Sequence, residues 1–202
     1  MIFELKNILS VEQTRTMQEM IRKGTLDCFL GTNGKYDDDM EAILLSSESL
    51  YLVATNHFLK THTTLDPDKL VNGKTECDLK NFQNLPFVGN HKQSTAFHLI
   101  NQMKERCGIV LNEVLFTDDY EVSEGICRTG SAASIFPELM IPPILRENLF
   151  YEQDYQIYAL PIRGLQNSIQ FCLVKNRFHY YPLYAEDFFR ILKKVVHECL
   201  LT

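Results

Sequence analysis

The sequence has no apolar run of the eighteen or so residues that a membrane-spanning helix requires. It also lacks the apolar core of a secretory signal, because Glu4 and Lys6 place charges among its first residues. Basic residues are in deficit, so the 202-residue chain carries a net charge of −6 and does not attract nucleic-acid phosphate or anionic lipid as a whole. We therefore expect a cytoplasmic protein with no membrane partner that does not bind DNA by itself.

Closely spaced cysteines or histidines, which zinc and redox sites use, are also missing. The six cysteines are single and scattered, as is typical of small core residues in a reducing compartment. The closest histidines, His57 and His62, are five residues apart, a spacing that turns both toward one metal neither on a helix nor on a strand. We expect neither a metal site nor a disulfide framework.

Catalytic signatures are absent as well. The chain has no Gly-x-Ser-x-Gly elbow, phosphate-binding loop or dinucleotide fingerprint, and no period of 20 to 50 residues repeats. We expect no cofactor and no catalytic residues. Spacing alone leaves open a catalytic cysteine paired with a histidine.

The composition indicates a folded α/β protein. With 45% apolar and 23% charged residues, the chain can bury one sizeable core or two small lobes. Short apolar segments alternate with amphipathic ones, which predicts a mostly parallel sheet. A polar, irregular stretch over residues 56–84 indicates either a boundary between two lobes or a long surface loop.

The most regular stretch covers residues 118–137. Asp118 and Asp119 are helix-capping residue types, and Gly130 can adopt the left-handed conformation that ends a helix. The apolar run over residues 132–136 is typical of a strand covered on both faces. Because ligand crevices lie at the ends of such strands, we expect this unit to border a binding site.

Other elements follow from capping residues and apolar periodicity. Helices are predicted over residues 11–23 behind a capping box at 10–13, over 94–107 behind Ser94, over 137–146 with an interruption at Pro142 and Pro143, and after Pro182. Strands are predicted over residues 3–9, 26–31, 42–45, 50–55, 86–89, 109–116, 155–161 and 168–174, with a turn at 46–49.

Four stretches carry a family resemblance. Residues 21–31 read Ile-Arg-Lys-Gly-Thr-Leu-Asp-Cys-Phe-Leu-Gly, which resembles the helix, Gly-x-Leu-Asp and buried strand of the effector-binding domain of LysR-type transcriptional regulators. Residues 50–57, 85–88 and 128–137 are similar to later landmarks of that family, in the same order. The first strand and helix of the family domain, and the helix-turn-helix before them, are not visible in this sequence.

The resemblance implies two Rossmann-like lobes of type II periplasmic-binding-protein architecture, joined by two crossovers. Lobe I would comprise residues 1–57 plus 166–202, without its first strand, and lobe II residues 58–165. The resemblance also implies a small-molecule effector, DNA contact only through the helix-turn-helix, and a homodimer or homotetramer. In the family, helices corresponding to residues 11–23 and 94–107 pack one subunit against its mate.

Candidate effector-binding residues follow the ends of the predicted strands and the start of the second-lobe helix. They are Thr32, Asn33, Asn90, His91, Lys92, Ser94, Thr95, Thr117, Asp118 and Ser131. Free backbone N–H groups at the helix start, with Lys92 beside them, lead to the hypothesis of a small anion bound there. The alternative is structural, since Ser94 can simply cap the helix and Asn33 can simply form a turn.

Three functions are compatible with these patterns. The sequence favours the effector-sensing domain of a LysR-type regulator. A solute-binding protein of a transporter has the same architecture but normally needs an export signal. An enzyme on the same fold is the third alternative, because a fold alone does not specify a reaction.

Overall fold

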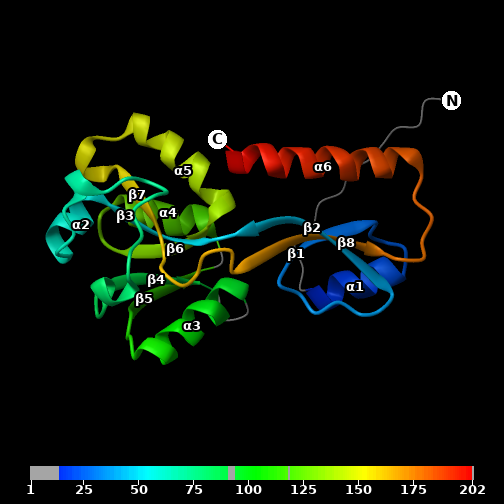
Figure 1. Ribbon diagram of the computed structural model, residues 1–202, viewed down its shortest axis with the longest axis horizontal. Helices are drawn as coiled ribbons and strands as arrows, with labels where there is room; N and C mark the ends of the chain where they lie inside the picture. Colours follow the sequence, from blue (N-terminus) through cyan, green and yellow to red (C-terminus); the bar gives the residue numbers. More distant parts are fainter. Residues whose placement is uncertain (1–13, 91–93, 118, 202) are drawn as a thin grey trace.

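The computed structural model describes residues 14–90, 94–117 and 119–201, arranged as two sheets side by side along the long axis (Figure 1). The strand predicted over residues 3–9 and the capping box at 10–13 lie outside the described residues. The strands are β1 Cys28–Thr32, β2 Met40–Glu48, β3 Leu50–Thr55, β4 Pro86–Asn90, β5 Asn112–Thr117, β6 Ala133–Pro137, β7 Ile157–Pro161 and β8 Ile169–Asn176. The helices are α1 Thr14–Arg22, α2 Asn56–His62, α3 Thr95–Cys107, α4 Tyr120–Arg128, α5 Ile141–Glu147 and α6 Leu183–Leu201, with short 3-10 turns between them.

The larger sheet has the order β5-β4-β6-β3-β7 and lies between two helical layers. Every residue of β3 is buried. On one face, Leu50 and Leu52 join a core with Phe58 of α2 and Ile100 of α3. On the other face, residues of β3 and β7 meet α4 and α5, with Ile144 among the buried side chains. The result is a three-layer α/β arrangement, in agreement with the α/β class that the sequence predicts.

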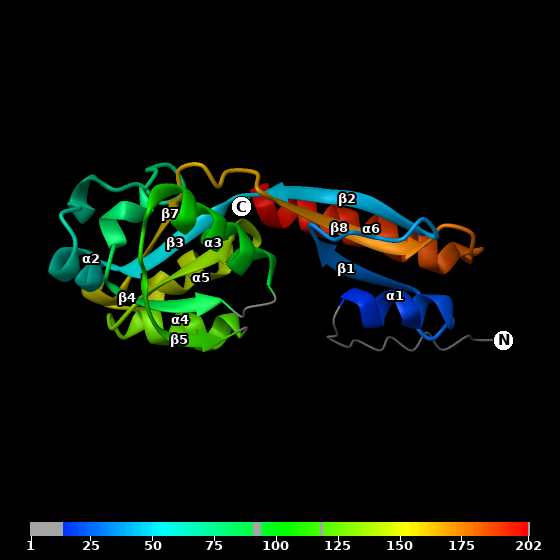
Figure 2. The same ribbon diagram turned by 90° about the horizontal axis from the view of Figure 1, so that it is seen from below.

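The smaller sheet has the order β1-β8-β2, with α1 on one face and α6 on the other (Figures 1 and 2). Ile21 of α1, Phe29 of β1 and Val174 of β8 form the core on the α1 face. The prediction of a mostly parallel sheet holds for the larger sheet, where the described strands β4, β5, β6 and β7 share one direction and β3 runs against them. It is wrong for the smaller sheet, where β1 and β2 both pair antiparallel with β8. Periodicity along the chain does not reveal strand direction.

The chain passes from the smaller sheet to the larger one between β2 and β3. The predicted turn at residues 46–49 is wrong, since β2 continues to Glu48 and Ser49 alone separates it from β3 in the other sheet. These residues stay extended because positions 46–48 pair with residues 169–171 of β8. The domain limits at 57/58 and 165/166 stay a prediction.

Proline placement also differs from the prediction. Pro142 and Pro143 lie in the first turn of α5 and help to open it, whereas an interruption was expected. The first N–H groups of a helix have no partner inside the helix, so proline loses nothing there and its fixed φ suits the start. In the described part of the chain, no helix combines the length and apolar character that a membrane crossing requires.

The ends predicted for the helices α3 and α4 are confirmed. Ser94 caps α3 by accepting a hydrogen bond from the Phe97 N–H, and Gly108 ends it in the left-handed conformation, at φ 63°. Asp119 caps α4 by accepting hydrogen bonds from two backbone N–H groups of the first turn. Gly130, at φ 74°, turns the chain into β6.

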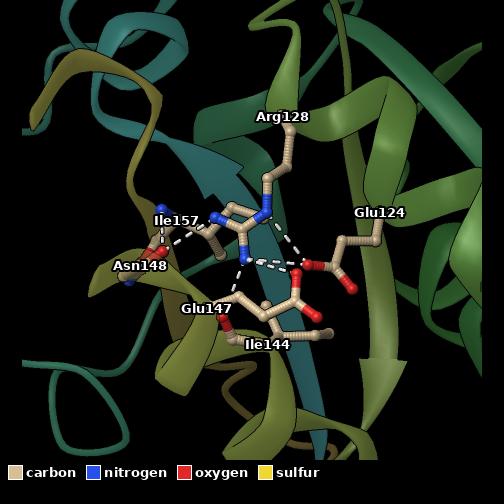
Figure 3. A network of polar contacts seen from close by, with 6 residues as sticks. All are labelled: Glu124, Arg128, Ile144, Glu147, Asn148 and Ile157. Atoms are coloured by element: carbon tan, nitrogen blue, oxygen red, sulfur yellow. Dashed lines mark hydrogen bonds and ion pairs between the residues drawn. The ribbon is translucent and has the colours of Figure 1, made fainter. Parts of the chain in front are cut away.

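A buried arginine ties α4 to α5 and β7 (Figure 3). Arg128 is only 6% exposed. Its guanidinium donates to Glu124 Oε1 at 2.8 Å and to the Ile144 carbonyl at 2.7 Å. It also donates to Asn148 Oδ1, and Asn148 in turn bonds both backbone groups of Ile157. Each donor points at a fixed acceptor, so the three elements are held in one geometry.

We predict that Arg128→Met lowers the free energy of unfolding by about 3–5 kcal/mol, because it leaves Glu124, the Ile144 carbonyl and Asn148 Oδ1 without the cation that they bind. The matched control is Arg163→Met, which removes an exposed ion pair to Glu76 at 3.4 Å and is expected to cost about 0–1 kcal/mol. Urea denaturation of both variants measures the difference. Equal losses would contradict the structural role of Arg128.

Candidate functional site

A pocket of about 360 Å³ lies where the two sheets meet, and both sheets contribute to its walls. Ile169 and Phe171 at the start of β8 face it, together with Leu139 and Met140 from the turn after β6. The polar side chains that line it are Thr14, Thr32, Glu48, Ser94, Thr95 and Tyr120. A pocket with apolar walls and a few converging polar groups is the usual form of a small-molecule site.

The structure brings three of the predicted residues together at this pocket: Thr32, Ser94 and Thr95. Thr32 ends β1, and Thr95 begins α3. The Thr95 hydroxyl donates to the Thr32 carbonyl at 3.2 Å, and the two hydroxyl oxygens are 2.9 Å apart. Each hydroxyl has one proton, so Thr32 is the donor between the hydroxyls. This bonded pair is a direct polar link between the two halves of the molecule.

Glu48 is a pocket residue that the sequence did not reveal. Its side chain is at the end of β2, with the residue only 2% exposed, and accepts hydrogen bonds from the Ser46 hydroxyl at 3.0 Å and the Leu139 N–H at 3.2 Å. Burial raises the pKa of its carboxyl, and these two hydrogen bonds oppose that rise. The residue follows two serines in a segment that has the composition of a turn, so no signal of burial was available.

Glu138, in the turn after β6, makes contacts that correspond to those of Glu48 at the passage from β2 to β3. Its carboxylate accepts hydrogen bonds from the Ser49 N–H at 3.0 Å and from the Tyr51 hydroxyl, and its own N–H donates to the Ser49 carbonyl. Each glutamate therefore binds backbone on the other's segment. The crossing from β2 to β3 is fixed against the turn that follows β6.

Tyr120 is the second residue that sequence reasoning missed. Its ring lies against Phe136, with centroids 5.2 Å apart, and it lines the pocket. Burial is the main cause that raises its phenol pKa, and the Glu48 charge adds to the rise. Burial therefore shifts the pKa of both groups in the same direction, upward.

The remaining predicted residues have other surroundings. Asn33, at φ 43°, donates from its amide to the Ser168 carbonyl and accepts from the Gln170 N–H, so it shapes the turn after β1. Thr117 accepts from the Asp119 N–H, and the Ser131 hydroxyl lies 2.8 Å from that of Thr129. None of these lines the pocket.

Asn90 ends β4 and is only 7% exposed. Its amide donates to the Ile135 carbonyl at 3.4 Å, and its Oδ1 has no hydrogen-bond partner among the described residues. His91, Lys92 and Asp118 lie outside the described residues. A second pocket, of about 430 Å³, lies against α5 and includes Tyr51 and Glu138, but all its lining comes from the larger half.

A family model described as the LysR substrate binding domain matches residues 4–196. No curated protein matches significantly. The regulatory domain of HypT from Salmonella typhimurium, in its apo form, is 14% identical with a TM-score of 0.65, over 98% of this chain and 86% of that one.

Two ligand-bound structures are also similar. The regulatory domain of CcmR from Synechocystis PCC6803, in complex with 2-PG, is 12% identical with a TM-score of 0.62, over 90% of this chain and 78% of that one. The effector binding domain of QuiR, in complex with shikimate, is 15% identical with a TM-score of 0.60, over 94% of this chain and 77% of that one. At such identities, these likenesses show a shared fold.

We predict that Glu48→Gln weakens the dependence of stability on pH. A folded-state pKa above the ordinary value of about 4.3 means that the Glu48 contribution is full below that pH and is lost as pH rises through the folded value. Glutamine cannot ionise, so the free energy of unfolding of the variant should fall less between about pH 4 and pH 7.

Urea denaturation across that pH range measures the effect, with Glu41→Gln on the same strand as the control, because Glu41 pairs with Lys175 at 3.3 Å. The burial argument fails if Glu48→Gln and the wild type show parallel pH curves.

Proposed function

We propose that the pocket where the two sheets meet binds the effector of a LysR-type transcriptional regulator, because this chain belongs to the LysR substrate binding domain family. The fold is that of the family's effector-binding domains, which have type II periplasmic-binding-protein architecture. The observation that supports the pocket is the convergence of Thr32, Ser94 and Thr95, from both halves, on one cavity.

Binding at this place provides a physical means of regulation. A ligand that contacts residues of both sheets has an affinity that depends on how the two halves are placed, so it favours one placement over others. The Thr32 and Thr95 hydrogen bonds span the same boundary and would be altered or reinforced by the ligand. In the full regulator, this shift would control DNA binding and transcription.

We propose a small anion as the effector. The Ser94 hydroxyl oxygen accepts the capping bond from the Phe97 N–H, and no described residue accepts its proton, so that this proton can be donated toward the pocket. Helix α3 has 13 residues, and the first N–H groups of such a helix carry partial positive charge. Shikimate, the ligand in the QuiR complex, is a carboxylate and fits this chemistry.

Other properties complete the proposal. The protein acts in the cytoplasm as a homodimer or homotetramer, catalyses no reaction, and contacts DNA only through a helix-turn-helix outside this sequence. A solute-binding protein of a transporter is the alternative. An appended helix-turn-helix in the open reading frame would distinguish the regulator from that alternative.

We predict that Thr95→Val weakens effector binding by about 1–3 kcal/mol, because it removes a hydroxyl that lines the pocket and links its two sides. A thermal-shift screen of small carboxylates and phosphates identifies a ligand, and calorimetry then gives its affinity for each variant. Ser131→Ala, outside the pocket lining, is the control and should bind normally. Equal affinities for wild type and Thr95→Val would place the effector elsewhere.

We also predict that these 202 residues alone give no sequence-specific gel shift at physiological salt, because their net charge of −6 offers no footprint that neutralises phosphate. A gel shift that is abolished only by unlabelled DNA of the same sequence would contradict this prediction.

A further inference from the structure

The pocket of about 430 Å³ along helix α5 has a lining that suggests a second ligand. Its wall on α5 and in the turns at both ends of that helix includes Glu138, Ile141, Leu145, Arg146 and Leu149, and Tyr51 of β3 lies across from them. We call it the α5 pocket. Its volume is that of a small-molecule site, and none of its lining residues also lines the pocket where the two sheets meet.

The spacing of the apolar residues explains the wall of the α5 pocket. Ile141, Leu145 and Leu149 are four residues apart, and side chains at that spacing lie one above the other on a helix. Ile141 is buried in the core beneath α5, whereas Leu149 is 87% exposed. The wall is therefore covered at one end and open at the other, so an apolar group placed on it would be removed from water.

The inner end of the α5 pocket presents hydrogen-bond acceptors. The Tyr51 hydroxyl donates to Glu138 Oε1 at 3.3 Å, and Glu138 Oε2 accepts from the Ser49 N–H at 3.0 Å. Burial and the Glu138 charge raise the pKa of Tyr51 to about 12, so the phenol keeps its single proton at neutral pH. Because that proton points at Glu138, the remaining lone pairs of both groups accept hydrogen bonds from a ligand.

The inner end also carries negative charge without a counterion. The partners of Glu138 are the two donors already described, and no described cation pairs with it. Glu48 is a second carboxyl nearby, and the Glu138 charge is one of the causes that raise its pKa. A half-buried carboxylate has lost part of its hydration, so a cation beside it is favourable. An ammonium group supplies both the charge and the donors.

Arg146 places the opposite charge on the same wall. It is exposed in the last turn of α5 and has no ion-pair partner among the described residues. From Glu138 to Arg146 the helix axis rises by roughly 13 Å, at about 2.0 Å per residue in the 3-10 turn and about 1.5 Å per residue in α5. Helical side chains lean toward the N-terminus, so the guanidinium reaches back along the wall toward Glu138. The two charges flank the apolar residues.

We propose that the α5 pocket binds a free amino acid with a large apolar side chain, such as phenylalanine or leucine. The ammonium group lies at Glu138 and the Tyr51 oxygen, the carboxylate lies at Arg146, and the side chain packs on the apolar wall. Arginine binds a carboxylate through two parallel hydrogen bonds. A simple amine would leave Arg146 without a partner and a simple carboxylate would leave Glu138 without one, so the zwitterion is selected over both.

The position of the α5 pocket links it to the proposed effector pocket. Glu138 lines the α5 pocket, and the next two residues, Leu139 and Met140, line the pocket where the two sheets meet. Glu48 in that second pocket accepts from the Leu139 N–H. An amino acid that displaces Glu138 therefore changes both sites and acts as a second signal. This coupling rests on the proposed function, whereas the amino-acid site itself does not.

Calorimetry of the full chain with phenylalanine and with leucine, up to millimolar concentration, tests the proposal, and binding at one site is expected. Arg146→Gln should weaken phenylalanine binding at least about tenfold, because the carboxylate loses its charged donor. Arg106→Gln is the matched control. It removes another exposed arginine, in the last turn of α3 and outside both pockets, and should leave the affinity unchanged. Circular dichroism verifies that each variant is folded.

Two analogues of phenylalanine test the two charged contacts separately. Phenethylamine lacks the carboxylate and should bind Arg146→Gln as well as it binds the wild type. Hydrocinnamate lacks the ammonium group and should bind the wild type more weakly than phenylalanine does. Glu138→Gln should weaken the binding of phenylalanine and of phenethylamine, since the neutral amide attracts an ammonium group less strongly.

Two results would overturn the proposal. One is the absence of binding by either amino acid at millimolar concentration, and the other is equal affinity of the wild type and Arg146→Gln for phenylalanine. Thr95→Val identifies the site in the second case. If that variant alone loses phenylalanine, the amino acid occupies the pocket where the two sheets meet, which supports the proposed function and rejects the α5 site.

Discussion

The crossing between β2 and β3 is the constraint on which the rest of the structure depends. One extended segment serves both sheets, with Ser49 as the only residue between its two parts. The carboxylates of Glu48 and Glu138 hold this crossing by binding the backbone N–H groups of Leu139 and Ser49, respectively. Because these carboxyl oxygens satisfy backbone donors at the crossing, the two halves meet in a defined geometry.

The pocket is a consequence of that geometry. With β2 and β3 fixed against the turn after β6, the ends of β1 and β8 and the start of α3 face one another across a cavity. Glu48 therefore has two roles, since it fixes the crossing and lines the pocket. This explains how a buried, protonatable group that stabilises the fold also offers a polar contact to a ligand. Thr32 and Thr95 complete the connection on the opposite wall.

The smaller half differs from the larger in how fully it is covered. The larger sheet has helices on both faces, and β3 is buried along its whole length. The smaller sheet has three described strands, and among its described neighbours Leu30 of β1 and Ile191 of α6 are 42% and 55% exposed. This half also supplies Thr32 to the pocket.

The sequence by itself determined the features that depend on near neighbours. Ser94, Gly108, Asp119 and Gly130 mark helix ends through bonds or dihedral angles within a few residues, and all four were predicted correctly. The ends of β1 and the start of α3 were also local enough to indicate Thr32, Ser94 and Thr95 as candidate site residues.

Tertiary structure decided the rest. Residues 46–48 remain a strand because they pair with β8, more than a hundred residues later in the chain, and composition favoured a turn. Glu48 reaches the pocket through this pairing, and the ring of Tyr120 lies there against Phe136. Local rules reach as far as one helical turn, whereas strand direction and the burial of a carboxyl depend on which distant segment lies alongside.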